Sequence, residues 1–441
     1  MFKNYVQRRL EKFVKKYFKK HNVKLIVVVG SVGKTTTKYA IANVLARRYR
    51  VIFNPGNMNS KEISVQLAIL GLDKPPKEKL RSPLAWMAIF SYIKKRIRKK
   101  PADVDVIVQE LGTARPGEIP HFSSYLRPDI AVVTAVSPEH MENFPGGMEE
   151  VAREELSVAS YSDLTIINRD NVSDEYAQFA DTTNLTTYGL NDGEYHLEIL
   201  SGTPLNGYEC KFFGPEFPNG VHMTIRLLGE HSLKSALAAI TVATKMKMSG
   251  EEIAAAIQEF RPVNGRMNPL RGAKGSTIID DTYNAAPDAV KEAIRTLYQI
   301  EAPQRIAILG SMNELGEMSA EAHQEIGNLC EPTLLDWVIT IGKDAENFLA
   351  PAAKKMGNKV RSFSNPVAAG IFVRNRILED GAVVLVKGSQ NGVFAEEATK
   401  MLLGDAAEES KLVRQEFGWM EKKSAWIESL KDTDQSNIQD Y

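Results

Sequence analysis

Three observations predict an α/β protein made of two doubly wound units with mostly parallel sheets. From residue 24 onwards, apolar runs of strand length alternate with segments of helical periodicity. This alternation stops at the hinge-like segment Arg261-Pro-Val-Asn-Gly and then starts again. The 441 residues of the chain also exceed what one ordinary hydrophobic core accommodates. We therefore expect four regions: a basic amphipathic helix over 1–23, a central unit over 24–260, a C-terminal unit over 261–403 and a charged helical tail over 404–441.

The central unit opens with the buried-strand pattern Lys24-Leu-Ile-Val-Val-Val, which ends at Gly30 and is followed by a helical pattern from Lys34. A strand, a glycine loop and a helix in this order are typical of the start of an α/β domain. Residues 192–228 contain short alternating runs and turn residues, which predict antiparallel strands. The other expected elements are strands at 104–109, 130–135 and 164–168 and helices near 231–247 and 250–260.

The C-terminal unit repeats the alternation of strand and helix, which predicts a second doubly wound sheet of ordinary domain size. Its strands are expected at 277–280, 305–309, 337–341 and 382–386. Its helices are expected near 287–299, 319–329, 344–356, 366–378 and 393–403.

The composition is that of a soluble globular protein, with 43% hydrophobic and 25% charged residues, and it excludes a disordered or fibrous chain. Cys210 and Cys330 lie far apart without metal-ligand spacing, so we expect no disulfide framework and a reducing compartment. The sequence has neither an apolar run long enough to span a bilayer nor a signal-peptide pattern. We therefore expect a cytoplasmic protein.

The first candidate site is the loop in Val-Val-Val-Gly-Ser-Val-Gly-Lys-Thr-Thr-Thr-Lys. Gly30 and Gly33 allow a tight turn whose N–H groups face a phosphate at the positive end of the helix. Lys34 can reach the β and γ phosphates, and Thr35 carries the hydroxyl that a magnesium ion requires. The spacing is shorter than the general Walker pattern, because Val28 occupies the position of its first glycine. The alternative is a glycine turn with a surface lysine, but the flanking strand and helix favour nucleotide binding.

Two further side chains follow predicted strands, at the sheet edge where ligands of parallel sheets bind. Glu110 comes directly after the strand at 104–109, and His140 follows the next strand along the chain. Alone, such a glutamate is often a cap or a solvated charge, and such a histidine is more often a structural group. The phosphate loop one strand away is what favours a magnesium site.

At this point the motifs resemble those of the Mur ligases. The central unit contains G-S-V-G-K-T-T-T, E-L-G-x-x-x-P-G-E-I, P-E-H-M-E-N-F and E-E-V-A-R-E. The C-terminal unit contains V-N-G-R-M, I-I-D-D-T-Y-N-A-A-P-D, I-A-I-L-G-S-M-N-E-L-G-E and V-L-V-K-G-S in the family's order. The resemblance covers about residues 25–403 and is greatest to the members that add D-alanyl-D-alanine. It implies a central P-loop ATPase domain with a mostly parallel sheet and a C-terminal Rossmann-like ligase domain.

The resemblance implies that ATP and Mg²⁺ bind between these two domains. The residues that it implies for catalysis are Lys34, Glu110, His140 and Arg266. Those that it implies for nucleotide binding are Gly30, Ser31, Val32, Gly33, Lys34, Thr35, Thr36, Ser235, Arg266, Asp281, Tyr283 and Asn284, the last three on the ribose and base side. The metal ligands would be Thr35, Glu110, His140 and Glu155. Lys387 and Ser389 are weaker candidates for binding the amine.

The chain departs from the family pattern at four places. Glu155 stands where the family places a carbamylated lysine, so it could bind magnesium directly, through water or not at all. Ser232 and Ser235 replace two asparagines expected near adenine, which leaves the choice of nucleotide open. Gln390 replaces an arginine that commonly follows the K-G-S motif. The phosphate loop begins at residue 30, which leaves no room for the usual N-terminal domain that binds a uridine-diphosphate sugar.

Basic residues gather near the N-terminus although the whole chain is formally neutral. The predicted helix at 2–20 has lysines on one face and aromatic residues on the other, and residues 83–100 combine aromatic residues with the run K-K-R-I-R-K-K. Packed helices with a solvated face are the commoner outcome of such patterns. The second interpretation is contact of residues 1–20 and 83–100 with an anionic membrane, at its inner face. Nucleic acid is not expected, because no binding motif accompanies the charge.

Three hypotheses follow. The leading one is a monomeric ATP-dependent ligase that acts through an acyl phosphate and adds an amine, D-alanyl-D-alanine, to a carboxylate-bearing cell-wall precursor peptide. The second keeps this chemistry but changes the substrate to a lipid-linked precursor or another amide-linked polymer, which the missing N-terminal domain favours. The third is a nucleotide-binding scaffold that no longer ligates, supported by Glu155, Ser232 and Ser235 and opposed by the intact Gly-Lys-Thr motif.

Overall fold

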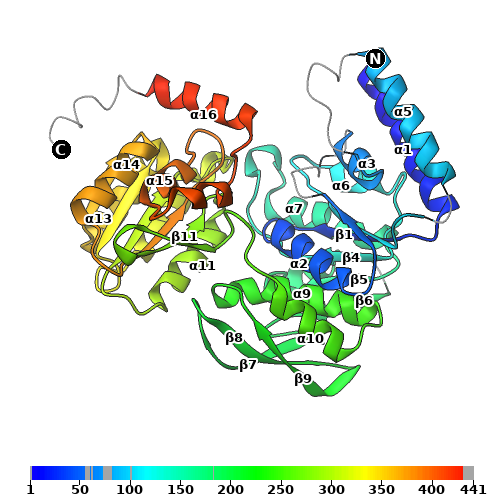
Figure 1. The fold of residues 1–441 in the computed structure, drawn as a ribbon, viewed down its shortest axis with the longest axis horizontal. Coiled ribbons are helices and arrows are strands. Elements are labelled where there is room, and N and C mark those ends of the chain that lie inside the picture. Colours follow the sequence, from blue (N-terminus) through cyan, green and yellow to red (C-terminus); the bar gives the residue numbers. More distant parts are fainter. Residues whose placement is uncertain are drawn as a thin grey trace.

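A computed structural model describes residues 2–54, 60, 63–72, 82–99, 102–181 and 183–430. Figure 1 shows a central body and a C-terminal body side by side, with a pair of helices projecting from the central body near the N-terminus. Within the described ranges, no helix combines the length and apolar character needed to cross a membrane.

A six-stranded parallel sheet forms the core of the central body. Its strand order is β2-β3-β1-β4-β5-β6, so the strand before the phosphate loop lies in the middle of the sheet. The register places Val28 beside Glu110, which brings the end of β3 next to the start of the loop. The strands are β1 (Lys24–Val29), β2 (Val51–Phe53), β3 (Val106–Glu110), β4 (Ile130–Val133), β5 (Thr165–Asn168) and β6 (Leu185–Tyr188).

Helices cover both faces of this sheet because its middle strand is apolar on both sides. Leu25, Val27 and Val29 belong to one core, whereas Ile26 and Val28 belong to the other, as the alternation along a strand requires. The first core is closed by α1 (Phe2–Lys20), α3 (Ser64–Ile69), α5 (Pro83–Arg98), α6 (Glu118–Phe122) and α7 (Gly147–Leu156). The second is closed by α2 (Lys34–Ala46), α9 (Glu230–Lys245) and α10 (Gly250–Glu259). A short helix, α8 (Asp174–Ala177), follows β5.

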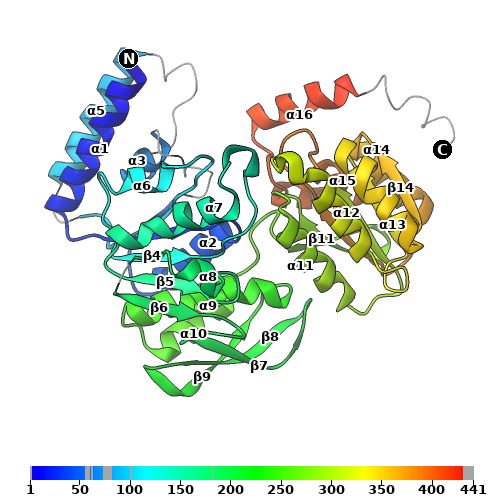
Figure 2. The ribbon, with the colours of Figure 1, turned by 180° about the vertical axis from the view of Figure 1, so that it is seen from behind.

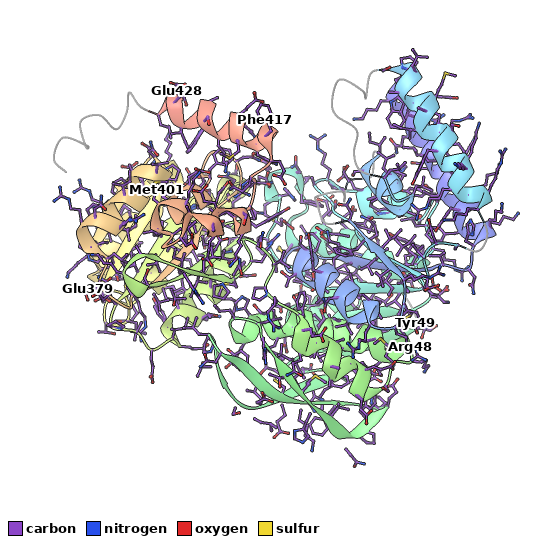
Figure 3. The ribbon with its side chains drawn as sticks, viewed as in Figure 1. Arg48, Tyr49, Glu379, Met401, Phe417 and Glu428 are labelled. Atoms are coloured by element: carbon purple, nitrogen blue, oxygen red, sulfur yellow. The ribbon has the colours of Figure 1, made fainter. Side chains whose placement is uncertain are left out.

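A separate antiparallel sheet lies below α9 and α10 in Figure 1 and confirms the strands predicted within 192–228. Its strands are β7 (His196–Thr203), β8 (Gly207–Gly214) and β9 (Phe217–Ile225). The end of α2 is tied to the same region, because the Arg48 guanidinium donates to the carbonyl of Lys247 at 2.7 Å and the Tyr49 hydroxyl to that of Met246 at 2.7 Å (Figure 3).

The C-terminal body contains a mixed six-stranded sheet with the order β10-β11-β15-β12-β13-β14. Only β10 runs antiparallel to its neighbour. The strands are β10 (Asn268–Arg271), β11 (Thr277–Asp281), β12 (Arg305–Gly310), β13 (Trp337–Ile341), β14 (Val360–Phe363) and β15 (Val383–Lys387). One face packs on α11 (Pro287–Tyr298), α12 (Ser319–Leu329) and α13 (Ala350–Met356), and the other on α14 (Pro366–Phe372) and α15 (Glu396–Leu402).

Sequence analysis did not anticipate four of these strands, namely β2, β6, β10 and β14. They have three or four residues each and lie at or next to sheet edges, so they carry little of the apolar signal of the inner strands. In β10 the proline at position 269 also argues against a strand, and it is accommodated on an antiparallel edge.

The segment after α15 folds back onto the C-terminal body. It forms a short 3-10 helix over Ala406–Lys411 and then α16 (Phe417–Ser429), whose ends are marked by Phe417 and Glu428 in Figure 3. The part of the predicted helical tail over 431–441 lies outside the described residues, as does Lys100 of the second basic run.

Candidate functional site

The phosphate loop is held in a conformation that requires its two glycines. Gly30 has φ 120°, and a Cβ there would come within 2.5 Å of the Thr134 hydroxyl oxygen; Gly33 has φ 85°. Thr134 and Ser31 fix the loop onto the residues after β4, because the Thr134 hydroxyl donates to the carbonyl of Val32 at 2.6 Å and the Ser31 amide donates to that of Ala135 at 2.9 Å. The loop is thus preformed on the sheet edge.

Helix α2 starts at Lys34 directly after the loop, and its N-cap, Gly33, provides no side chain to cap the first turn. The first N–H groups of a helix have no partner within the helix and create a positive end. Together with the glycine turn, this uncapped end fits the phosphates of a nucleotide.

The Lys34 ammonium folds back across the loop. It donates to the carbonyls of Gly30 and Ser31, the latter at 2.9 Å, and lies 3.1 Å from a carboxylate oxygen of Glu139. Burial favours the neutral amine, but the carboxylates of Glu139, Glu155 and Glu110 outweigh it and raise the pKa of the lysine. A fixed positive charge therefore sits at the loop.

A hydroxyl and a carboxylate meet at the next position of the helix. The Thr35 hydroxyl donates to Glu110 at 3.1 Å, and the Lys38 ammonium lies 3.1 Å from the same carboxylate oxygen. Burial opposes ionisation of Glu110, but Lys38 and Lys34 outweigh it and lower its pKa. An ionised carboxylate beside a hydroxyl is the kind of oxygen pair that Mg²⁺ takes in nucleotide sites, so these two residues fit the ion that the sequence predicted.

Arg266, from the C-terminal body, lies close to Thr35 at the start of α2. Its guanidinium lies 4.0 Å from the ring centroid of Tyr283, and one of its nitrogens is 3.5 Å from the Thr35 hydroxyl. Its Nε is buried and, within the described residues, has no hydrogen-bond partner. A half-buried guanidinium with an unused Nε donor, close to the start of α2, fits an anionic ligand.

His140 also links the two bodies, through a residue that sequence analysis did not identify. Its Nδ1 lies 2.9 Å from a carboxylate oxygen of Glu314, and both residues have positive φ, 53° and 67°. Burial disfavours the imidazolium, but Glu314 and Glu139 outweigh it and raise the pKa of His140. In this geometry His140 is an ion-pair partner through Nδ1. Metal ligation would use Nε2 and would require the imidazolium to lose a proton, while the Nδ1–H group keeps its bond to Glu314.

Two cavities lie on either side of the loop, and Val32, Gly33 and Arg266 line both. The first, of about 290 Å³, contains Glu110, His140, Tyr283, Asn284, Glu118 and Gln390 in its walls. The second, of about 130 Å³, contains Thr36, Asn171, His231, Ser232, Ser235 and Asp281. Of the three residues expected on the ribose and base side, Asp281 therefore faces one cavity, whereas Tyr283 and Asn284 face the other.

Glu155 lines neither cavity. It is buried beneath the loop, where one carboxylate oxygen accepts a hydrogen bond from the Gly30 amide at 2.8 Å. Within the described part of the chain, no three His, Cys, Asp or Glu side chains are grouped to hold a metal ion. A magnesium ion at Thr35 and Glu110 would thus complete its coordination with phosphate and water oxygens.

The two weaker candidates have structural partners. The Lys387 ammonium donates to Asp281 at 2.5 Å and to the carbonyl of Asn284 at 3.0 Å. Burial lowers its pKa, although Asp281 opposes this. The Ser389 hydroxyl accepts from the Asn313 amide at 2.9 Å. Lys387 therefore fixes the end of β11, at Asp281, and the segment after it, at Asn284.

Lys38, Glu139 and Glu314 are not among the residues predicted from the sequence. A helical period would have revealed Lys38, which lies one turn after Lys34 on the same face of α2. Glu139 precedes His140 at the same strand end. Glu314 follows β12 in a different body, so only the arrangement of the bodies brings it to His140.

A buried ionic network anchors the segment after α15 next to the site. The Arg414 guanidinium donates to Glu396 at 2.6 and 2.7 Å and to the carbonyls of Thr282 at 2.6 Å and Tyr283 at 3.0 Å. The Lys423 ammonium of α16 lies 2.5 Å from Glu397. Because Tyr283 stacks on Arg266, this network supports the position of the arginine.

The sequence matches two family models in the order of its two bodies. Residues 28–243 match the Mur ligase middle domain, and residues 265–390 match the Mur ligase, glutamate ligase domain. A Bacillus subtilis UDP-N-acetylmuramoyl-tripeptide–D-alanyl-D-alanine ligase is 29% identical over 365 residues, which cover 80% of this chain and 70% of that protein. The Escherichia coli enzyme of the same name is 24% identical, over 85% and 75% of the two chains.

Solved structures share the fold. MurF from Acinetobacter baumannii superposes with a TM-score of 0.73 at 23% identity, covering 91% of this chain and 80% of that one. MurF ligase from Thermotoga maritima, solved in complex with ADP, gives a TM-score of 0.72 at 23% identity, over 91% and 84% of the chains.

Proposed function

The chain belongs to the Mur ligase family and is a ligase of that family, and we propose that it uses ATP to join D-alanyl-D-alanine to a carboxylate of a peptidoglycan precursor peptide. The observation that carries the proposal is the meeting of Thr35, Glu110 and Arg266 at the uncapped start of α2. The names of the similar enzymes support this choice of substrates. A cytoplasmic site of action follows from the same substrates.

In this proposal the phosphates of ATP bind the first-turn amides of α2, with Lys34 and Arg266 as cationic partners. Thr35 and Glu110 would hold Mg²⁺, which neutralises phosphate charge when bound. The second cavity would take the nucleoside, against Thr36, Ser235 and Asp281. That the similar Thermotoga maritima ligase was solved in complex with ADP supports a nucleotide as the ligand.

The first cavity would take the precursor carboxylate. Its oxygen attacks the γ-phosphorus of ATP, the bond to ADP breaks, and an acyl phosphate forms. The amine of D-alanyl-D-alanine then attacks the acyl carbon, and phosphate leaves with one former carboxylate oxygen. The charges of Lys34, Arg266 and His140 stand around this cavity, where negative charge accumulates. Because its walls come from two bodies, closure of the bodies on the substrates would shield the acyl phosphate from water.

The test is phosphate release from Mg-ATP by the purified protein. It uses soluble and lipid-linked muramyl peptides, each with and without D-alanyl-D-alanine, and mass spectrometry of the products. The proposal expects release only with both partners and a product heavier by the dipeptide. Lys34→Ala is the inactive control. ATP binding that Lys34→Ala abolishes, without turnover of any pair, would instead support the non-ligating scaffold.

A second candidate keeps the chemistry and takes a lipid-linked precursor or another amide-linked polymer. The observation that favours it is the basic helix pair that projects from the central body in Figure 2. In the same assay, turnover of the lipid-linked peptides but not of the soluble peptides would select this candidate.

A further inference from the structure

Helices α1 and α5 lie side by side in parallel, although more than sixty residues separate them in the chain. The rings of Phe13 and Phe90 are 5.7 Å apart, and the Arg96 guanidinium lies 5.6 Å from the Tyr17 ring. Near the end of both helices, the His21 ring lies 3.1 Å from the carbonyl oxygen of Ile97. The N-terminal turns of both helices therefore meet at the free end of the α1–α5 pair.

The free end of this pair is apolar and exposed. The side chains in the first turns of the two helices are 41% exposed at Phe2, 55% at Tyr5, 77% at Leu84 and 66% at Met87. Removing such apolar side chains from water would be favourable. The packing between α1 and α5 does not bury them, because it uses other residues, among them Leu10, Phe13 and Trp86. We call this exposed end, formed by Phe2, Tyr5, Leu84 and Met87, the tip; its apolar surface is available to a binding partner.

Behind the tip, the pair is strongly basic. Helix α1 has eight basic residues and one acid, and α5 has four basic residues and no acid. A surface depression on α1 of about 560 Å³ is lined only by donor-bearing side chains, Asn4, Tyr5, Arg8, Arg9 and Lys12. Because the whole chain is formally neutral, the remainder carries the balancing negative charge. An anionic surface would attract the pair and repel the remainder.

We propose that the α1–α5 pair docks on an anionic lipid bilayer, with Phe2, Tyr5, Leu84 and Met87 inserted among the acyl chains and the lysines and arginines on the headgroup phosphates. An apolar tip followed by a basic collar fits the polarity gradient of a bilayer surface. Nucleic acid would satisfy the charge but would leave the aliphatic tip residues Leu84 and Met87 in water.

The helix pair contacts α6, a helix that contributes to the wall of the site. On α1, Glu11 lies 3.0 Å from the His121 ring of α6, and the first residue of α6, Glu118, lines the first cavity. Docking would therefore hold the substrate side of the cavity near the bilayer. The inference rests on the helix pair alone and not on the proposed substrates.

The experiment is flotation of the full chain with vesicles of phosphatidylcholine alone or mixed with phosphatidylglycerol, at low and high salt and without substrates. The tip variant is Leu84→Ser with Met87→Ser, and the basic variant is Lys12→Gln with Lys16→Gln, all at exposed positions. Matched controls on the C-terminal body are Met356→Ser with Ile371→Ser and Lys354→Gln with Lys355→Gln, also exposed.

We expect binding to the mixed vesicles only, and high salt should weaken it. Each lysine replaced by glutamine should weaken binding by about fivefold. The tip variant should lose binding by a similar or larger factor, while the controls bind as the parent and all variants still bind ATP. Equal binding to both vesicle types, or parent-like binding by both variants, would overturn the proposal. Capture of duplex RNA or DNA in place of vesicles would also overturn it.

Discussion

The carboxylate of Glu155 accepts a hydrogen bond from the backbone amide of Gly30 at 2.8 Å, beneath the phosphate loop and outside both cavities. The family pattern has a carbamylated lysine at this position. Burial, and the nearby carboxylates of Glu139 and Glu154, raise the pKa of Glu155 to about 7, against the opposing effect of Lys34 and the Gly30 amide. The residue therefore supports the loop with a carboxyl group that titrates near neutral pH.

We predict that Glu155→Gln stabilises the protein above neutral pH. Between its ordinary pKa of 4.5 and about 7, the unfolded chain releases the Glu155 proton while the folded chain keeps it. The contribution of the Glu155 carboxyl to the free energy of unfolding is thus complete below pH 4.5 and is lost as the pH rises to about 7. Glutamine still accepts from Gly30 without this loss, so its advantage should reach on the order of 3 kcal/mol.

Urea unfolding at mildly acidic and mildly alkaline pH measures this difference. The exposed Glu149→Gln, six residues earlier on α7, is the matched control and should show no pH-dependent gain. A Glu155→Gln variant that is less stable than the parent at alkaline pH would show that the charge itself holds the loop.

Replacing Lys34 with methionine should strongly lower turnover while the fold persists. The variant keeps the aliphatic length but removes the charge that lies at the loop carbonyls and Glu139. We expect a fall in kcat/KM of ~100-fold or more, because in the proposed function this charge stabilises the transferred phosphoryl group. Steady-state phosphate release measures it, with the exposed Lys354→Met as control. Near-parental activity would remove Lys34 from the site.

Arg266→Lys should lower kcat much more than stability. Lysine keeps the charge but loses the planar group that stacks on Tyr283 and reaches Thr35. We expect a loss of ~100-fold in kcat with a nearly unchanged melting temperature.

A double-mutant cycle with Tyr283→Ala tests whether the stacking matters. Coupling of roughly 1 kcal/mol or more is expected between the two positions, whereas Tyr283→Phe keeps the ring and should behave as the parent. Additive effects of Arg266→Lys and Tyr283→Ala would show that the stacking of Arg266 on Tyr283 does not contribute to turnover.

Arg414→Met should destabilise the C-terminal body. Among the described residues, it leaves the fully buried carboxylate of Glu396 with the more distant Lys423, at 3.6 Å, as its cationic partner. Removing one partner of a buried ion pair costs about 3–5 kcal/mol. Thermal unfolding should show a lower midpoint, and Glu421→Gln, at an exposed position of α16, should not. An unchanged midpoint would mean that the network contributes nothing to stability.

The sequence predicted those parts of the site that lie along one sheet edge. Lys34, Thr35 and Glu110 come together because β1 and β3 are parallel neighbours and end side by side. Apolar strands and helical periods likewise predicted the order of most elements. Neither signal exists for three- or four-residue edge strands such as β10, whose proline argues against pairing.

The rest of the site depends on contacts between distant segments. Glu314 meets His140 only through the arrangement of the two bodies. Asp281, the last residue of β11, and Tyr283, two residues later, line different cavities; Lys387 holds Asp281 and Arg266 covers Tyr283. No local pattern specifies such placements.

The most direct test of the central claim follows an oxygen atom. The precursor peptide is labelled with ¹⁸O in its reacting carboxylate and incubated with Mg-ATP, D-alanyl-D-alanine and the enzyme, and the released phosphate is analysed by mass spectrometry. Transfer through an acyl phosphate predicts that one labelled oxygen leaves with each phosphate. Unlabelled phosphate, or release of pyrophosphate in its place, would contradict the mechanism.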